Sequence, residues 1–330
     1  MRRRWVTAAE VAEAAGVSRS AVSRAFTDGA SVAPDTRARV MQAATRLGYA
    51  PSAVGRGLVA ARTGLVGLVV AELSNPFYAA LTAAVAEELR AAGRAPLLLL
   101  APAADRTDEL LPSLAGWRVD GVIIASATLG SRMARLCAAA RIPVVLLDRQ
   151  GTARPRGVRE VASDNEAAGA LAARALLARG HRRPAFVAGI EDTATSRARE
   201  AGFLRGLAAG GVALAGRAVG HYTRPGGAAA ARALLGRRPR PDAIFCANDE
   251  MALGVLDAAR AELGLRVPEE LSVLGFDDIA PAALEGYALT TLRQDVAGLA
   301  AAAVAALEDG APARRLLPCA WVERGTVRPA

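Results

Sequence analysis

The 330-residue sequence contains no lysine, so all 41 of its basic side chains are arginines. Cysteine is nearly absent as well: Cys137, Cys246 and Cys319 are far apart and odd in number, which predicts neither a disulfide framework nor a metal site. The only histidines, His181 and His221, complete no Ser/His/Asp set, and no glycine-rich phosphate loop is present. These absences argue against an enzyme and imply no cofactor.

Long apolar runs are also missing. Although 52% of the residues are hydrophobic, alanine inflates that fraction, and no uncharged apolar run reaches the 18 residues that a membrane-spanning helix needs. Glu10 and Glu13 interrupt the apolar region that a secretory signal peptide would require. We therefore expect a cytoplasmic protein without membrane contact.

Positive charge is concentrated at the start of the chain. The first 62 residues hold ten arginines against Glu10, Glu13, Asp28 and Asp35, a net charge of +6, whereas the whole chain has +9 and the other 268 residues only +3. A small basic segment joined to a nearly neutral remainder is typical of a domain that binds a polyanion. A solvated basic tail is the alternative, but the apolar periodicity of this segment argues against it.

Three short helices are predicted in the basic segment. The first begins with a capping-box pattern at Thr7 and Glu10 and ends at Gly16. The second is capped by Ser18 and ends near residue 26, and the third runs from about Pro34 to residue 47. Two helices joined by a short turn with glycine form a helix-turn-helix pattern.

The second of these helices has an unusual polar face. Apolar residues recur at positions 17, 21, 22, 25 and 26, which form one stripe on a helix. The opposite face carries Arg19, Ser20, Ser23 and Arg24, and no acidic residue. An acid-free face with arginines and small hydroxyls suits contact with nucleic acid.

From Leu65 onward, apolar runs of strand length alternate with alanine-rich helical stretches. The runs are "LVGLVVA", "APLLLLA", "DGVIIAS", "IPVVLLD", "PAFVAGI", "PDAIFCAN" and "LSVLGF". This alternation predicts parallel sheets covered on both faces, with enough strands for two sheets. Polar residues end several strands: Asn75, Ser126, Asp148, Asn248 and Asp277. Because ligands bind at the carboxyl ends of such strands, these side chains are binding candidates.

The order of these patterns resembles that of the lactose-repressor-type (LacI/GalR) transcriptional regulators over essentially the whole chain. The resemblance is carried by "VTAAEVAEAAGVSRSAVSRAF", "LGYAPSAVGRGLVAARTGLVGLVV", "SNPFY", "DGVII", "IPVVLLDR", "FCANDEMALGVL" and "LSVLGFDDI…LTTLRQD". It implies an all-α helix-turn-helix head plus an α/β core of two Rossmann-like lobes, of the periplasmic-binding-protein type, joined by three crossovers.

The resemblance also implies domain limits. We expect a helix-turn-helix domain at 1–49, a hinge helix or linker at 50–63, and an effector-binding and dimerisation core at 64–330. Within the core, the N-lobe is expected at about 64–162 and 292–320, and the C-lobe at about 163–291 and 321–330.

For DNA, the resemblance implies that the second helix lies in the major groove. Arg19, Ser20 and Arg24 match base-reading positions, and the residues that match backbone-holding positions are Ser18, Thr27 and Thr36. Leu58 matches a hinge leucine that wedges into the minor groove, although Gly55 and Gly57 depart from the usual pattern and each weakens a hinge helix by about 0.5–1 kcal/mol. A plain helical hairpin, with Leu58 a linker residue, is the alternative.

Nine residues match effector-binding positions between the lobes: Asn75, Phe77, Asp148, Thr195, Arg199, Tyr222, Asn248, Asp277 and Gln294. Carboxylates accept from vicinal hydroxyls, Arg and Asn donate, and an aromatic ring covers an apolar face, so a sugar is expected. Each residue could instead have a strand-end or capping role, most clearly in the pair Asp277-Asp278. Arg199 is expected outside the core, reaching across a water-filled cleft toward Asp148.

The function expected from this resemblance is that of a homodimeric repressor that binds a palindromic operator and responds to a small effector. Activation of transcription, or a non-sugar effector, stays open. A solute-binding transport protein would share the core but needs a signal peptide and no basic head. No apolar heptads follow the core, so a dimer is expected rather than a tetramer.

Overall fold

The computed structural model describes residues 6–27, 29–50, 63–101, 107–126, 131–149, 157–308 and 310–329. It divides into two compact units, Met1–Gly64 and Leu65–Ala330, which we call the head and the core. The predicted hinge residues Gly55, Gly57 and Leu58 lie outside the described residues. Across the described ranges, no helix combines the length and apolar character needed to cross a bilayer.

The head contains the three predicted helices, α1 (Ala8–Ala15), α2 (Arg19–Ala25) and α3 (Pro34–Leu47). The capping box is present, because the Glu10 amide donates to Thr7 Oγ1 at 3.4 Å and the Thr7 amide donates to Glu10 Oε2 at 2.7 Å. Gly16 and Gly48 end α1 and α3 with φ of 62° and 67°, which glycine adopts without a Cβ penalty. The predictions for the head helices are confirmed.

The N-lobe of the core is built on a parallel sheet with the strand order β11-β5-β4-β3-β1-β2. Its strands are β1 (Leu65–Val70), β2 (Ala95–Leu100), β3 (Gly121–Ala125), β4 (Val144–Leu147), β5 (Val158–Ser163) and β11 (Arg314–Leu317). Its helices are α5 (Pro76–Ala91), η1 (Thr107–Leu110), α6 (Leu111–Gly116), α7 (Ser131–Ala139) and α12 (Val296–Ala305).

The C-lobe has a second sheet with the order β12-β10-β9-β8-β6-β7, in which only β12 runs antiparallel to its neighbour. Its strands are β6 (Pro184–Ala188), β7 (Gly216–Val219), β8 (Ala243–Cys246), β9 (Ser272–Asp277), β10 (Thr290–Arg293) and β12 (Ala320–Val322). Its helices are α8 (Asn165–Ala178), α9 (Ala194–Ala209), α10 (Arg224–Leu235), α11 (Asp249–Asp257), the π-helical η2 (Ala258–Glu262) and η3 (Ala280–Ala283).

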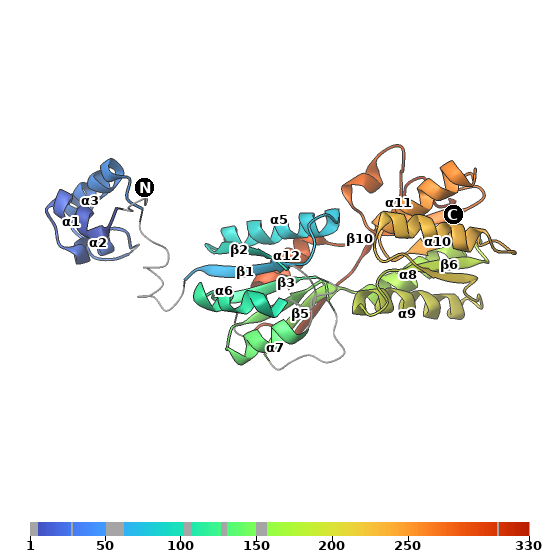
Figure 1. The fold of residues 1–330 in the computed structure, drawn as a ribbon, viewed down its shortest axis with the longest axis horizontal. Helices are drawn as coiled ribbons and strands as arrows, with labels where there is room; N and C mark the ends of the chain where they lie inside the picture. The colour runs from blue at the N-terminus through green and yellow to red at the C-terminus, as the bar shows by residue number, and fades with distance from the viewer. Residues whose placement is uncertain are drawn as a thin grey trace. The chain divides into compact units, whose positions relative to one another are not determined.

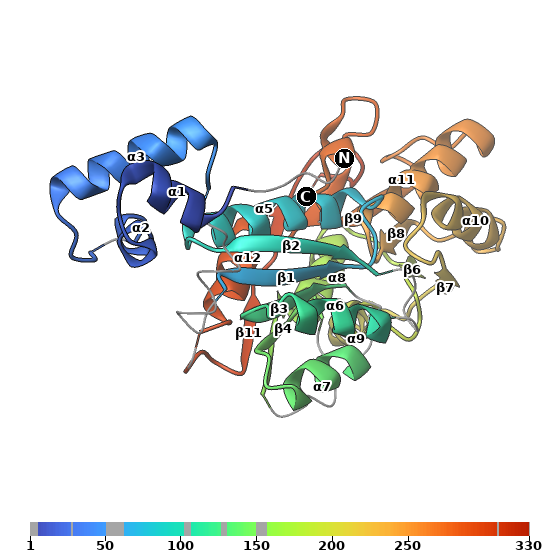
Figure 2. The ribbon, with the colours of Figure 1, turned by 60° about the vertical axis from the view of Figure 1, so that its left-hand side comes forward.

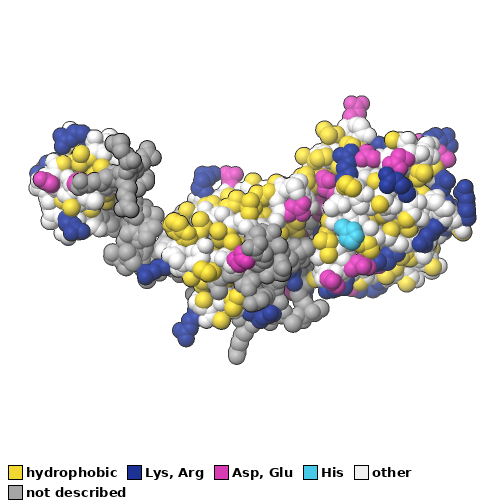
Figure 3. Space-filling model, in the orientation of Figure 1, with side chains coloured by type: hydrophobic (Ala, Val, Ile, Leu, Met, Phe, Trp, Pro, Cys, Tyr) yellow, Lys and Arg dark blue, Asp and Glu magenta, His cyan; other side chains and the backbone are white. Residues whose placement is uncertain are grey.

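Helices cover both faces of each sheet, as continuous apolar strands require. In the N-lobe, α5 and α12 lie on one face and α6 and α7 on the other; in the C-lobe, α8 and α9 lie opposite α10 and α11 (Figure 1, Figure 2). β2 is an edge strand, and its outward side exposes Leu98 and Leu100. Hydrophobic side chains gather on the surface over β2 and α5 (Figure 3).

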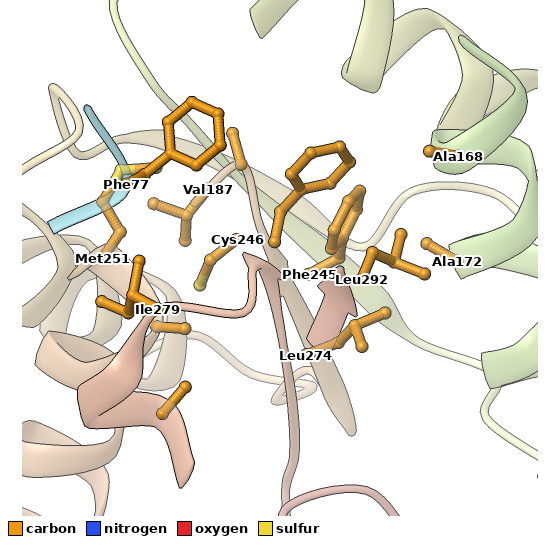
Figure 4. Close-up of a cluster of buried hydrophobic side chains, with 14 of the residues drawn as sticks. Phe77, Ala168, Ala172, Val187, Phe245, Cys246, Met251, Leu274, Ile279 and Leu292 are labelled. Atoms are coloured by element: carbon orange, nitrogen blue, oxygen red, sulfur yellow. The ribbon is translucent and has the colours of Figure 1, made fainter. Parts of the chain in front are cut away.

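The chain passes between the lobes three times, at 163–165, 293–296 and 317–320. We call these segments the first, second and third crossovers. A buried apolar cluster includes side chains of both lobes, among them Phe77 of α5 and Met251 of α11 beside Val187 and Cys246 (Figure 4). The predicted fold, a helical head with two Rossmann-like lobes and three crossovers, is confirmed.

Candidate functional site

The head presents the predicted base-reading residues on the outer face of α2. Arg19, Ser20 and Arg24 are exposed, whereas Val22 and Ala25 are buried against the other helices. The helix carries two guanidinium groups and no carboxylate, so its free face is positive. Such a face suits hydrogen bonding to base edges and attraction to phosphate.

Two of the three hydroxyls predicted to hold the DNA backbone, those of Ser18 and Thr27, already have partners within the head. Ser18 Oγ accepts from the Ala21 amide at 3.2 Å and thus caps α2, while Thr27 Oγ1 donates to the Ser23 carbonyl at 2.9 Å. A hydroxyl has only one proton, so Thr27 must release Ser23 before it can donate to a phosphate. Thr36 lies half-exposed in the first turn of α3.

Arg37, on α3, contacts the end of α2 and the loop that follows it, and the sequence patterns did not single out this residue. Its guanidinium donates to the Ala25 carbonyl at 2.6 Å and to the Ala30 carbonyl at 3.5 Å. It therefore ties the end of α2, and the loop that follows, to α3. Helical periodicity identifies Arg37 only as a surface position, which gives no sign of this contact.

A pocket lies between the two lobes of the core, with an empty volume of about 550 Å³ that includes space open to solvent. N-lobe residues line it after β1, β3 and β4: Ala71, Glu72, Asn75, Phe77, Tyr78, Ser126 and Asp148. C-lobe residues line it from the loops after β6 to β8, the end of β9 and the start of α9: Ile190, Thr195, Arg199, His221, Tyr222, Asn248 and Asp277. The carboxyl ends of both sheets thus face one space, where α/β sheets bind ligands.

Eight of the nine residues predicted at the effector site line this pocket; the exception is Gln294, which donates to Asp277 Oδ1 at 2.8 Å from behind it. Glu72, Tyr78 and His221 are lining residues that the prediction missed. Tyr78 had a usable signal, because it directly follows Phe77 at the start of a helix.

Four lining residues have a left-handed backbone: Asp148 (φ 58°), His221 (54°), Tyr222 (62°) and Asp277 (123°). Such conformations cost about 1–3 kcal/mol each and concentrate at functional sites. Gly189 makes room for one of them, because a Cβ there would lie 2.1 Å from Cζ of Tyr222. The pocket wall is therefore fixed by the backbone as well as by side chains.

Asp148 lines the pocket and has one buried carboxylate oxygen without a partner in the described part of the chain. Its side chain is 3% exposed; Oδ2 accepts from the Tyr78 hydroxyl at 2.9 Å, but buried Oδ1 has no partner among the described residues. Burial raises the pKa of this carboxyl, while the positive charge of Arg199 and the Tyr78 hydrogen bond act in the opposite direction. The side chain would have to turn Oδ1 toward the pocket before a hydroxyl of a bound molecule could satisfy it.

The expectation that Arg199 lies in a water-filled cleft, outside the core, is wrong. Its side chain is 3% exposed, Nε donates to Asn165 Oδ1 at 2.7 Å, and Nη1 donates to the Ala247 carbonyl. Nη1 also lies 3.8 Å from Asp277 Oδ1, and the guanidinium stacks 3.6 Å from the Phe276 ring centroid. A buried guanidinium needs such partners, and its own lobe supplies them.

Two lining residues cap helices, as the alternative interpretation of the strand-end residues predicted. Asn75 Oδ1 accepts from the Phe77 amide at 3.0 Å and caps α5, and Asn248 Oδ1 accepts from the Met251 amide at 3.0 Å and caps α11. Both residues also line the pocket. Because the cap of α5 uses only the side-chain oxygen of Asn75, the amide nitrogen of Asn75 can donate to a ligand.

The expectation that Asp277 or Asp278 caps the next turn is wrong. Asp278 forms ion pairs with Arg293 and Arg324, each at 2.6 Å. The amide of Ile279 in the next turn donates to Asp249 instead, at 2.9 Å. Within the described part of the chain, no group of three His, Cys, Asp or Glu side chains could hold a metal ion.

Comparison with known families matches both units of the chain. Residues 7–52 match the family of bacterial regulatory proteins of the lacI type, and residues 63–305 match the periplasmic binding proteins and sugar binding domain of the LacI family. The transcriptional regulator CelR of Thermobifida fusca is 36% identical over 305 residues, covering 89% of this chain and 88% of CelR. Catabolite control protein A of Priestia megaterium is 32% identical, covering 91% and 90%.

Solved structures agree with these matches. The lac repressor dimer bound to operator and the anti-inducer ONPF superposes with a TM-score of 0.88 at 28% identity, covering 98% of this chain and 99% of that chain. A complex of the regulator CelR with cellobiose superposes with a TM-score of 0.74 at 32% identity, covering 97% and 99%. The chain therefore belongs to the LacI family of transcriptional regulators, which bind DNA and are not enzymes.

Proposed function

We propose that the protein is a homodimeric transcriptional repressor whose operator affinity is controlled by a small effector, a sugar, bound between the core lobes. One observation carries this proposal: a pocket lined by aromatic, charged and amide side chains at the carboxyl ends of two sheets belongs to a chain whose head presents an acid-free, positive helix. An effector that prefers one arrangement of the lobes would change the equilibrium between arrangements by its difference in affinity for them.

On DNA, Arg19, Ser20 and Arg24 read base edges in the major groove. Their exposure on one face of α2 supports this role, since arginine can donate two hydrogen bonds to guanine. Ser18, Thr27 and Thr36 would contact the DNA backbone and set the register. The wedge role of Leu58 rests on the sequence resemblance alone.

The sugar is held from both lobes. Asp148 Oδ1 is a buried acceptor without a partner, Arg199 and Asp277 line the opposite wall, and Phe77 and Tyr222 supply aromatic surface. A polyol presents many hydroxyl donors and an apolar ring face to such a site. The cellobiose complex of CelR, a relative in the same family, supports the choice of a saccharide.

The dimer uses the face formed by β2 and α5. Leu98 and Leu100 are 46% and 55% exposed on an edge strand, and small exposed residues of α5, such as Ala79 and Ala83, lie on the same lobe. An uncovered apolar edge strand is a pairing hazard unless a partner covers it. A twofold dimer would place two heads on two half-sites of a palindromic operator.

The test begins with in vitro selection of a DNA sequence by the full chain. Binding of the selected fragment is then titrated with a panel of neutral saccharides, including cellobiose, and with anionic sugar phosphates. We expect one neutral saccharide to weaken binding by about tenfold or more, within the usual range of allosteric coupling. An increase in affinity would indicate co-repression; no selected sequence, or no response to any saccharide, would contradict the proposal.

A further inference from the structure

Five buried polar residues form a closed ring behind the pocket, with the backbone carbonyl of Ser163 as one of its links. They are Ser163, Asn165, Arg199, Asp277 and Gln294, and none is more than 6% exposed. Only Arg199 and Asp277 line the pocket, and the other three lie one step behind it.

The first half of the ring starts from Arg199. Its Nε donates to Asn165 Oδ1 at 2.7 Å, and Asn165 Nδ2 donates to the Ser163 carbonyl at 3.0 Å. Because Ser163 and Asn165 belong to the first crossover, the buried guanidinium is tied directly to that segment.

The second half runs from Ser163 to Asp277. Ser163 Oγ donates to Gln294 Oε1 at 2.6 Å, and Gln294 Nε2 donates to Asp277 Oδ1 at 2.8 Å. Gln294 lies in the second crossover, and the side chain of Cys319, in the third, is within hydrogen-bonding reach of Ser163. The Arg199–Asp277 ion pair closes the ring at 3.8 Å.

The direction of the hydrogen bonds in the ring depends on the charge of Asp277. While Asp277 is ionised, a turned-over Gln294 amide would set its oxygen against the carboxylate and lose the hydrogen bond to Asp277, so the direction described above is favoured. Burial raises the pKa of Asp277, and a protonated Asp277 would instead donate to that oxygen. Side chains buried from water have no solvent partner to replace a broken bond, so neighbouring bonds shift together. A displacement of the Asp277 carboxylate therefore moves Gln294 and, through it, Ser163.

We infer that Ser163, Asn165 and Gln294 are positioning residues that convert contact at Arg199 and Asp277 into a change at the crossovers. The inference rests on the proposed function, since it assigns the route by which effector binding changes the lobe arrangement. These residues touch no effector: their loss removes the response to the effector and spares its affinity.

The test uses the full chain with two independent variants, Ser163→Ala and Gln294→Met, and their combination. Gln294→Met keeps the length of the side chain and removes both hydrogen bonds. Ser272→Ala is the matched control, because Ser272 is equally buried and also makes a hydrogen bond, with the Arg328 amide at 3.1 Å, but lies at the start of β9.

Two readouts are measured. Without ligand, hydrogen exchange should rise at 293–296 in Ser163→Ala and at 163–165 in Gln294→Met, while Ser272→Ala leaves both crossovers unchanged. With cellobiose as the probe, both ring variants should bind within about threefold of the parent, but its effect on affinity for the selected DNA should shrink at least about tenfold. The double variant should lose no more of the response to cellobiose than either single variant, because both substitutions break the same hydrogen-bond network.

Unchanged exchange at the other crossover, the one joined to the substituted residue by the Ser163–Gln294 hydrogen bond, in both variants would overturn the inference. So would a normal response to cellobiose in either variant, or equal losses of cellobiose affinity and response. If cellobiose does not bind the parent chain, the exchange experiment alone decides. A parent chain that responds to no saccharide would contradict the proposed function, and leaves the exchange result standing.

Discussion

Asp249 holds a carboxylate at a fully buried position in the first turn of α11. It accepts from Thr291 Oγ1 at 2.6 Å and from the Ile279 amide at 2.9 Å. Burial raises its pKa to about 6, the hydrogen bonds oppose that rise, and the nearby negative charge of Asp278 adds to it. Ionisation of this buried group therefore works against the folded state at neutral pH.

We predict that Asp249→Asn removes a pH dependence of stability. The pKa of Asp249 is about 6 when folded and near 3.8 in its ordinary state, so its stabilising contribution is present below about pH 4 and is lost as the pH rises to about 6. Relative to the variant, the parent should lose up to about 3 kcal/mol of unfolding free energy across this window. Urea unfolding of both chains from pH 4 to 7 measures the difference, and parallel curves would contradict the assignment.

Arg199→Ala should destabilise the core as well as affect the pocket. Removal of the guanidinium takes the ion-pair partner from Asp277 and the hydrogen-bond donor from Asn165 Oδ1 and the Ala247 carbonyl, a loss of about 3–5 kcal/mol for a broken buried pair. Arg197→Ala is the control on the same helix, because Arg197 is exposed and should change stability by less than about 0.5 kcal/mol. Similar melting temperatures for the two variants would show that Arg199 is not structural.

For individual residues, the sequence predicted which side chains line the pocket but not how deeply each is buried. Strand ends and family motifs led to eight lining residues. The burial of Arg199 depends on Asn165, Ala247 and Phe276, which come from three other segments, so no local pattern indicates it.

Among the elements, α2 is the one whose exposed face we expect to read sequence. Arg24→Ala should reduce affinity for the selected operator by about 1–3 kcal/mol and affinity for random DNA much less. Arg46→Ala, which removes an exposed arginine from α3, serves as the comparison for simple loss of charge. Equal losses on both DNAs for Arg24→Ala would show that Arg24 contacts only the DNA backbone.

Arg37 supports α2 from a neighbouring helix, so its substitution should act on the element as a whole. Arg37→Lys keeps the charge but loses the forked contact with the Ala25 and Ala30 carbonyls, at a cost of about 1 kcal/mol for a half-buried pair of bonds. We expect faster hydrogen exchange at the end of α2 and weaker operator binding, with the salt dependence on random DNA unchanged. Normal exchange in α2 would rule out this supporting role.

Helices and strands were the most predictable level, because their signals are local. Caps at Thr7, Ser18 and Gly16 predicted the head helices, and apolar runs predicted seven of the twelve strands. The π-helical turn η2 at the end of α11 was not predicted, and neither were the strands β5, β7, β10, β11 and β12, because these strands are short or interrupted by polar residues and form no continuous apolar run.

For the whole molecule, the edge strand β2 makes a specific prediction about assembly. Leu98→Arg should convert the dimer to a monomer, because a buried guanidinium without a partner would be strongly unfavourable in the apolar interface. Leu204→Arg, at a similarly exposed leucine on α9, should leave the dimer intact. Sedimentation velocity measures both; a dimeric Leu98→Arg chain, or a parent chain that is monomeric or tetrameric, would contradict the proposed face.

The architecture of two lobes and three crossovers followed from the order of motifs along the chain. The polar ring that joins the crossovers did not, since Ser163, Arg199 and Gln294 are far apart in sequence and individually ordinary. Such long-range polar contacts depend on the final placement of the sheets.

The Ser163–Gln294 hydrogen bond has a consequence for how this protein can change through evolution. Apart from the C-terminal segment that begins with β12, the C-lobe is one uninterrupted stretch of chain that enters and leaves through two hydrogen-bonded neighbours. A stretch whose ends meet can be exchanged between genes as a cassette with only two joints. One recombination event would replace a whole wall of the pocket and leave the head and the N-lobe wall as they were. The part of the ligand preference that the C-lobe determines can thus change while the operator that the head recognises stays the same.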